Sequence, residues 1–363
     1  MSEPNLRIPG PTPLPPSVCA AMSRQMINHR GPEFAAMQAE IVDGLKLFLR
    51  TEQDVLLLTA SGTGGLEAAV VNTLSPGDKV LSVSIGYFGQ RLRDIAAAYG
   101  ASIVPLDFEW GHAADPAQVA EALRANPDVK AVFITHNETS TGVTNPLKEL
   151  AATVKDAGKL LIVDAISSAG CVELETDAWG VDVLVTGSQK GWMAPPGLAF
   201  ITMSQAAWEA NSVARMPRFY FDLKKAKKAA QEGATPWTPA VTTYYALQEG
   251  LRLLLAEGRE NVFARHARIA DKTRAGVQAL GFTLFAEGRY ASNTVTSVRA
   301  PEGTDADALR KRVKAAHNVV LAGAQGKLAG RAFRIGHLGY VTDEDIDAVL
   351  AALKAEMAQP TTA

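Results

Sequence analysis

Seven short apolar runs alternate with helical patterns between residues 55 and 203, and this alternation constrains the fold more than any other feature. The runs are VLLL (55–58), KVLSV (79–83), SIVPL (102–106), AVFIT (131–135), LLIVD (160–164), VDVLVT (181–186) and LAFITM (198–203). Strands that are separated by helices form a mostly parallel sheet with helices on both faces. The sequence therefore predicts an α/β domain built on a mostly parallel seven-stranded sheet.

The remaining segments predict an arm and a second, smaller domain. A length of 363 residues exceeds the usual limit for one hydrophobic core. Residues 1–20 contain six prolines and cannot form a regular helix, so we expect an extended arm over the surface or over a neighbouring subunit. A long helical pattern at 242–280 is followed by mixed strand and helix patterns. We expect a large domain at 21–255 and a small C-terminal α+β domain at 256–363.

Composition and charge exclude several classes of partner. The net charge of -2, from 36 basic and 38 acidic residues, gives no electrostatic footprint for nucleic acid or an anionic membrane. No apolar run approaches the roughly 18 residues of a membrane span, and the first residues lack a signal-peptide pattern, so we expect a cytoplasmic protein. Cys19 and Cys171 are far apart without metal-ligand spacing, so neither a disulfide nor a metal site is expected.

A glycine-rich turn, ASGTGGLE (60–67), follows the first strand and leads directly into a helix. Free backbone amides at a helix N-terminus can bind a phosphate. The turn matches neither a Walker loop nor GxGxxG, so taken alone it is equally consistent with an ordinary tight turn. The absence of GxGxxG also argues against a dinucleotide-dependent oxidoreductase, the alternative from another enzyme class.

Polar residues follow three further strands. Asp164 ends LLIVD, Lys190 follows VDVLVT, and HNETSTG (136–142) follows AVFIT. Because the carboxyl ends of parallel strands meet at one edge of a sheet, we expect these groups to line one crevice. Separately, Asp164 and Thr139 could be helix or turn caps and Lys190 could extend to solvent.

A phosphate-binding turn, a carboxylate and a lysine in one crevice suit pyridoxal 5′-phosphate. The cofactor needs an anion site, a lysine for its Schiff base and a carboxylate that keeps the pyridine nitrogen protonated. A desolvated lysine has a lowered pKa and is a competent nucleophile. A non-catalytic binding protein gives no reason for Lys190 beside Asp164.

Seven motifs together resemble the class V aminotransferases in content and order. They are SGTGGLEAAV, GYFGQR, HNETSTGV, VDAISSAG, TGSQKGWMAPPG, TPWTPAV and FRIGHLG, and the resemblance spans nearly the whole chain from PGPTPLPP to RIGHLG. The sequence is most similar to the alanine/serine:glyoxylate branch of the fold type I pyridoxal-phosphate enzymes. The resemblance implies that fold, the cofactor and a homodimer with active sites shared between subunits.

The resemblance also assigns roles to individual residues. Lys190 matches the Schiff-base lysine and Asp164 the partner of the pyridine nitrogen. Phosphate contacts are implied for Ser61, Gly62, Thr63 and Gln189. The ring is implied to lie between Phe88, where relatives often have tryptophan, and Ile166, with its oxygen bonded by Thr139.

Further contacts implied by the resemblance come from outside the large sheet. Thr238 matches a phosphate ligand from the other subunit. Thr235 occupies a position where some relatives carry a phosphate-binding tyrosine, which leaves that contact open. Arg334 matches the arginine that binds the substrate carboxylate, for which a surface ion pair is the alternative. Gly10 is implied to offer a backbone amide to the same carboxylate.

The expected reaction is a ping-pong transfer of an amino group from serine or alanine to a 2-oxo acid such as glyoxylate or pyruvate. An aspartate-preferring aminotransferase is the alternative within the family, and a second acid-binding arginine would favour it. A lyase is a further alternative, but the desulfurases need a late, mobile cysteine and none follows Cys171. His29-Arg30 could contact a side chain or form a solvent-facing turn, and the basic run 224–228 is expected to be a solvated helical face.

Overall fold

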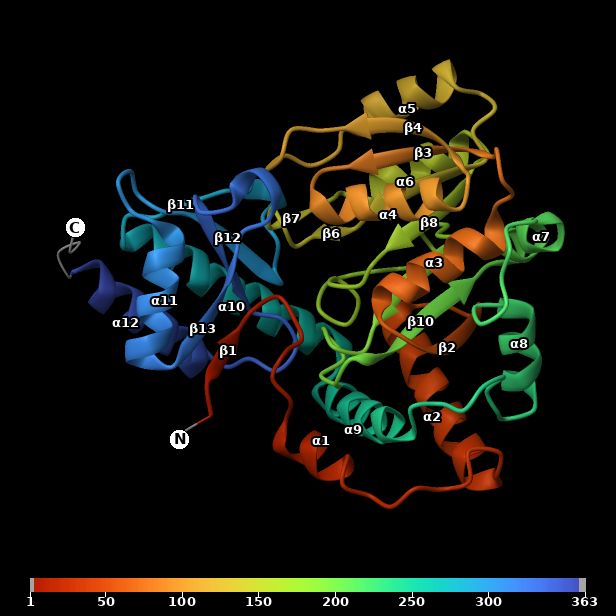
Figure 1. Ribbon diagram of the computed structural model, residues 1–363, viewed down its shortest axis with the longest axis horizontal. Coiled ribbons are helices and arrows are strands. Elements are labelled where there is room, and N and C mark those ends of the chain that lie inside the picture. Colours follow the sequence, from red (N-terminus) through yellow and green to blue (C-terminus); the bar gives the residue numbers. More distant parts are fainter. Residues whose placement is uncertain (1–2, 359–363) are drawn as a thin grey trace.

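The main sheet of the protein contains all seven predicted strands, which confirms the α/β prediction (Figure 1). The computed structural model describes residues 3–358, without the side chain of Lys327. In sheet order the strands are β2 (Asp54–Ala60), β10 (Gly197–Met203), β9 (Val183–Gly187), β8 (Leu160–Asp164), β5 (Ala131–Thr135), β3 (Lys79–Ser84) and β4 (Ser102–Asp107). Only β10 runs antiparallel to its neighbours among these pairs, so the sheet is mostly parallel.

Helices cover both faces of this sheet, because successive strand residues point to opposite sides. On one face Leu56 and Leu58 of β2 pack with α3 (Gly62–Thr73), α4 (Tyr87–Ala98), α7 (Gln205–Val213) and α8 (Leu223–Gln231). On the other face Val55 and Leu57 pack with α2 (Pro32–Leu49), α5 (Pro116–Ala125), α6 (Leu147–Asp156) and α9 (Val241–Glu257). The three-layer arrangement leaves the strand ends as the place for a binding site.

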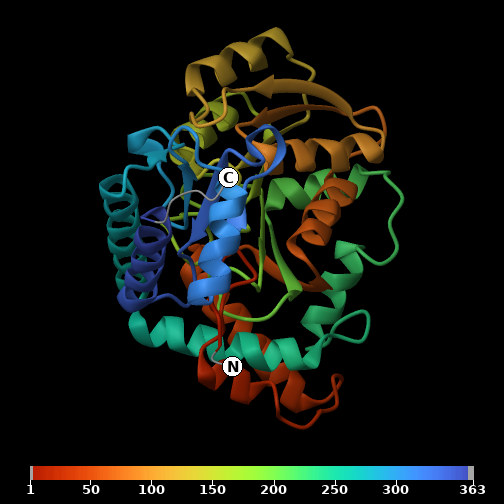
Figure 2. The same ribbon diagram turned by 60° about the vertical axis from the view of Figure 1, so that its left-hand side comes forward.

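A second sheet lies beside the first and has its own apolar core. Its order is β1 (Asn5–Arg7), β13 (Val319–Gly323), β14 (Ala332–Gly336), β12 (Val295–Arg299) and β11 (Thr283–Leu284). The helices α10 (Arg259–Ala279), α11 (Ala306–His317) and α12 (Asp343–Met357) pack with it, as the turned view in Figure 2 shows. A capping box between Thr342 and Asp345 begins α12.

The N-terminal segment differs from the predicted extended arm of residues 1–20. Residues 5–7 form β1, which pairs in parallel with β13, and Pro16–Ala21 form helix α1. Pro16 is tolerated because the first helical position needs no backbone N–H, and Val18 is fully buried against the large core. The prediction that these prolines exclude a helix was therefore wrong at α1. Residues 1 and 2 lie outside the described residues.

The predicted helical stretch at 242–280 is two helices, α9 and α10, which are separated by Gly258 at φ 87°. Leu254 of α9 packs in the core of the large sheet, whereas Ile269 of α10 packs in the core of the small one. The chain passes between the cores here, and the predicted division at 255/256 stays a prediction. Among residues 3–358, none of the helices combines the length and apolar content needed to cross a bilayer.

Candidate active site

A cavity lies at the carboxyl ends of the parallel strands. It brings together nearly all the residues that the sequence places after different strands. The predicted residues among its lining are Ser61, Gly62, Thr63, Phe88, Thr139, Asp164, Ile166, Gln189 and Lys190. Leu66, Arg91, Asn137 and Ser167 complete the lining.

One end of the cavity is the N-terminus of α3. Ser61 is the N-cap residue, but no side chain caps the helix, so its first amides are open to a ligand. A Cβ atom at Gly62 would lie 2.5 Å from Cδ1 of Ile166, so a larger residue here would force the Ile166 side chain to move. Next to it, the buried side-chain oxygen of Gln189 has no hydrogen-bond partner. Free amides at a positive helix end favour an anion.

Asp164 lies at the end of β8 and is buried in the cavity wall. Its Oδ1 accepts a hydrogen bond of 2.9 Å from the backbone N–H of Ile166. Burial raises its pKa to about 7, and the nearby charge of Glu138 adds to the increase. A carboxylate in this position gains from a cationic partner in the cavity.

Lys190 follows β9, and its amine points into the same cavity. Its Nζ donates a hydrogen bond to the carbonyl oxygen of Pro9. Gly10 lies against the amine so closely that a Cβ atom there would come within 2.7 Å of Nζ. Burial lowers the pKa of Lys190 to about 8, with a further lowering from the charge of Arg334, so an appreciable fraction of the amine is neutral near physiological pH.

Arg334 is on β14 of the small sheet and reaches toward the cavity wall. Its guanidinium donates to the carbonyl oxygens of Gly323, at 2.8 and 3.0 Å, and of Thr139, at 3.3 Å. It is only 7% exposed and its hydrogen-bond partners are neutral oxygens, including Oε1 of Gln325, which argues against the surface ion pair. Burial lowers its pKa to about 10, so it stays charged at neutral pH. Such a group suits a carboxylate ligand.

A model of the family described as Aminotransferase class-V matches residues 6–349. The chain belongs to the class-V aminotransferase family. This result confirms the resemblance inferred from the seven motifs.

Several relatives of this class-V aminotransferase match over nearly their whole length. A protein of Anabaena cylindrica named soluble hydrogenase 42 kDa subunit is 44% identical, with 96% of this chain and 92% of the relative covered. The L-aspartate–glyoxylate aminotransferase of Paracoccus denitrificans is 40% identical, with 93% and 86% covered. The serine–glyoxylate aminotransferase of Methylorubrum extorquens is also 40% identical, with 92% and 86% covered.

A solved structure of a family member has the same fold. The alanine–glyoxylate aminotransferase from Nostoc sp. superposes with a TM-score of 0.95 at 33% identity, and the match covers 98% of this chain and 96% of that one. The predicted fold of the pyridoxal-phosphate aminotransferases is therefore confirmed.

Asn137 lines the cavity of this class-V aminotransferase, although the sequence did not single it out. Its Nδ2 donates to the hydroxyls of Ser167 (2.8 Å) and Thr294 (2.9 Å). Its Oδ1 accepts from Thr144 (2.7 Å) and Ser292 (2.6 Å). Asn137 therefore ties the cavity wall to the loop that precedes β12 of the small sheet. Its position in HNETSTG (136–142), the segment after AVFIT, was the only signal for it.

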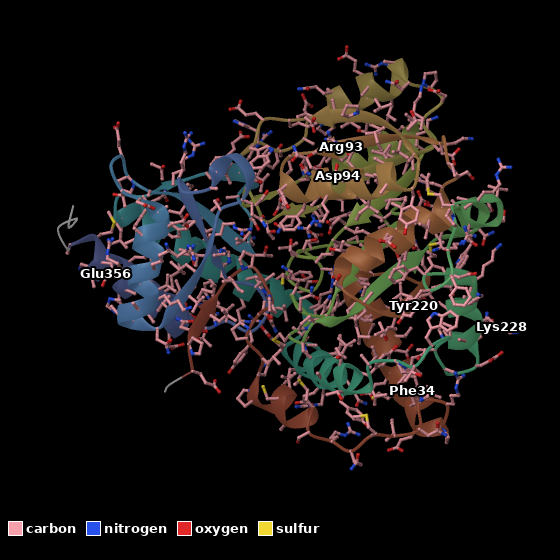
Figure 3. The ribbon with its side chains drawn as sticks, in the orientation of Figure 1. Phe34, Arg93, Asp94, Tyr220, Lys228 and Glu356 are labelled. Carbon is pink, nitrogen blue, oxygen red and sulfur yellow. The ribbon has the colours of Figure 1, made fainter. Side chains whose placement is uncertain are left out.

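Other predicted residues lie outside the cavity lining. Thr238 is exposed, whereas Thr235 is buried and its hydroxyl donates to the carbonyl oxygen of Trp237 at 2.7 Å. Their role at the cavity of another subunit stays a prediction. His29-Arg30 lies in the turn before α2 and does not line this cavity. The basic run lies on α8, where Lys228 is at the outer edge of the molecule (Figure 3).

Proposed function

We propose that the protein is a pyridoxal-5′-phosphate-dependent aminotransferase that moves an amino group from a small amino acid to glyoxylate or a similar 2-oxo acid. One observation carries the proposal: the Lys190 amine, the buried Asp164 carboxyl and the open N-terminus of α3 line a single cavity. These are an amine, a carboxyl group and an anion site, which the cofactor requires together. Family membership supports the same cofactor.

The phosphate end of the cofactor fits the first turn of α3. Ser61, Gly62 and Thr63 would offer amides and hydroxyls there, and the absence of a side-chain cap leaves these amides available. Gln189 lines the same cavity, and its side-chain NH₂ group would donate a hydrogen bond to a phosphate oxygen.

The ring of the cofactor fits between Phe88 and Ile166. Both line the cavity, and Ile166 is two residues after Asp164, so a ring over Ile166 would bring its nitrogen near the carboxyl group. A protonated pyridine nitrogen provides the cationic partner that the buried carboxylate needs. Thr139 also lines the cavity and would hydrogen-bond the ring oxygen.

When bound, pyridoxal phosphate supplies an aldehyde that condenses with amines and a ring that withdraws electrons from the substrate's α carbon. Lys190 contributes a partly neutral amine, which acts as a nucleophile and, once released, takes the substrate's α proton on Nζ. Asp164 holds the proton on the ring nitrogen. Arg334 would orient the carboxylate shared by amino acid and oxo acid, and Gly10 would offer a backbone amide to the same carboxylate.

The amino donor is open between serine, alanine and aspartate. Glyoxylate is the acceptor in the names of the relatives from Paracoccus, Methylorubrum and Nostoc, which supports it here. Arg91 supports the aspartate alternative, because its guanidinium lines the cavity whereas Arg334 lies outside the lining, and its Cζ is 4.7 Å from the centre of the Phe88 ring. A side-chain carboxylate would have a charged partner there.

We also propose that the protein acts as a cytoplasmic homodimer. Phe219 is 69% exposed and stacks on Trp237 at 5.1 Å, close in sequence to Thr235 and Thr238. An exposed aromatic cluster of this kind is typical of a protein interface. A partner subunit bound there would cover the cluster and could bring Thr238 to the other cavity. Size-exclusion chromatography with light scattering tests the dimer, and a monomer would refute it.

Reductive trapping tests the proposed chemistry. We expect the purified protein to be yellow, to bleach with borohydride, and to carry a reduced pyridoxyl group on Lys190 in its peptide map. Lys190→Ala should lose the colour, whereas Lys148→Ala, a change of an exposed lysine, should keep it. Absorbance changes with serine, alanine and aspartate then identify the donor. A pyridoxyl group on another side chain, or none, would refute the proposal.

A further inference from the structure

The carboxylate of Glu138 lies outside the cavity lining but contacts the helix that carries Phe88. Glu138 is on β6 (Asn137–Glu138), which pairs with β7 (Val143–Thr144) in a small hairpin. Its Oε2 accepts hydrogen bonds from the backbone N–H groups of Phe88, at 2.9 Å, and Gly89, at 3.0 Å. These amides belong to the first turn of α4, so the hairpin caps a helix that is distant in sequence.

Ser140 completes this cap. Its Oγ accepts a hydrogen bond from the backbone N–H of Tyr87 at 3.0 Å and donates one to Oε1 of Glu138 at 2.6 Å. The first three amides of α4 are therefore all bonded to side chains of the hairpin. The helix has no cap of its own, because its N-cap residue is Gly86. A Cβ atom at Gly86 would lie 2.5 Å from Cγ of Glu138, so only glycine permits this approach.

The hydrogen bonds define the charge state of Glu138. Oε1 accepts from the N–H and the hydroxyl of Ser140, and Oε2 accepts from two backbone N–H groups. Three of these four partners are backbone N–H groups, which can only donate, so the hydrogen bonds favour the ionised carboxylate. Complete burial raises the pKa of Glu138, but the four hydrogen bonds and the positive end of α4 oppose this change.

The hairpin that holds Glu138 is itself rigidly anchored. Asn137, the preceding residue, makes the four hydrogen bonds described above, and the carbonyl oxygen of Thr139 binds Arg334. Alternate residues of one short segment therefore serve different purposes: Thr139 faces the cavity, while Glu138 and Ser140 hold α4. The position of the Phe88 ring depends on this first turn of α4.

We propose that Glu138, with Ser140, is a positioning residue that fixes the Phe88 ring against the cofactor. The inference rests on the proposed function, because it assigns Phe88 to the face of pyridoxal phosphate. Glu138 acts through the backbone of α4 and does not itself contact the ligand. Substitution with glutamine would turn an NH₂ group toward amides that need an acceptor, and would displace this turn.

The test measures the dissociation constant of pyridoxal phosphate and the induced circular dichroism of the bound cofactor. Glu138→Gln should weaken cofactor binding by about tenfold or more, because charge-assisted hydrogen bonds are lost. It should also alter the induced dichroism, which reports the orientation of the ring. Glu149→Gln, which removes an exposed carboxylate from the first turn of α6, is the matched control and should change neither quantity.

A double-mutant cycle with Phe88→Ala separates positioning from general destabilisation. If Glu138 acts through the ring, Glu138→Gln should add little further loss of affinity once Phe88 is alanine. Independent, multiplicative losses would overturn the inference, and so would wild-type affinity and dichroism in Glu138→Gln. If Glu138→Gln fails to fold, Ser140→Ala, which keeps the Glu138 carboxylate, takes its place in the cycle with Phe88→Ala. The losses of cofactor affinity are then compared in the same way. A wild-type protein that does not bind pyridoxal phosphate would instead refute the proposed function.

Discussion

Replacement of Arg334 by glutamine should slow the reaction of Lys190 with aldehydes at neutral pH. Burial holds the pKa of Lys190 at about 8, and the charge of Arg334 is the second cause of that lowering. At pH 7.5 an amine with a pKa of about 8 is about 24% neutral, whereas one at 10.5 is about 0.1% neutral, a ratio of about 240-fold. Without Arg334 the pKa should lie between these values, and the neutral fraction falls accordingly.

Reductive alkylation of the cofactor-free protein measures this effect. A small uncharged aldehyde and cyanoborohydride are used between about pH 6 and about pH 10, and mass spectrometry compares the Lys190 peptide with the exposed Lys148 peptide. In the wild type, labelling of Lys190 should level off just above pH 8. Asp164→Asn should move the midpoint down, because Asp164 raises the pKa of Lys190. A wild-type rate that still climbs steeply near pH 10, or no upward shift in Arg334→Gln, would refute the reasoning.

Three further substitutions test the site. Asn137→Ala removes four hydrogen bonds, three of them buried, and should lower the free energy of unfolding in urea by about 4 kcal/mol. A loss under about 1 kcal/mol would contradict the role of Asn137. Arg334→Lys replaces the planar guanidinium with an ammonium group, and it should raise the KM of both substrates by about tenfold or more while cofactor affinity stays unchanged. Steady-state kinetics measure both KM values, and an effect on one substrate alone would count against the role of Arg334. Gly62→Ala should weaken cofactor binding in an equilibrium titration, because the added Cβ atom would meet Cδ1 of Ile166. Adding Ile166→Val, which removes Cδ1, should restore part of the affinity. If the affinity is not restored, the contact with Ile166 is not the cause of the weaker binding.

The large sheet and most of the cavity could be predicted because they depend on local patterns. Each strand is an apolar run bounded by turn residues, and parallel order places the residues after each run at one edge. The direction of β10 was also within reach, since residues 188–196 hold no helix that could return the chain for a parallel strand. The alternation of strand and helix patterns did not predict the order of the strands in the sheet.

The residues that were missed act through contacts between distant segments. Asn137 and Glu138 are small parts of a polar loop in the sequence, and their importance appears only when α4, Ser292 and Thr294 pack around them. Strand β1 is too short to show a periodic pattern, and its partner is almost at the other end of the chain. Arg334 was found through its motif, whereas its burial depends on the small sheet.

The pairing of β1 with β13 joins residues 5–7 to residues 319–321, two segments that are far apart in the chain. Asn5 donates a hydrogen bond to the carbonyl oxygen of Asp345, 340 positions later, and Thr12 binds the backbone carbonyl oxygens of Gln189 and Lys190. On the ribosome, a nascent chain that has not yet exposed β13 can assemble the large sheet around Lys190, but it cannot seat Pro9 and Gly10 against the amine. Cofactor capture in its final geometry therefore waits until β13 has been synthesised, and a chain that stops before β13 would present a lysine without its Pro9 and Gly10 contacts.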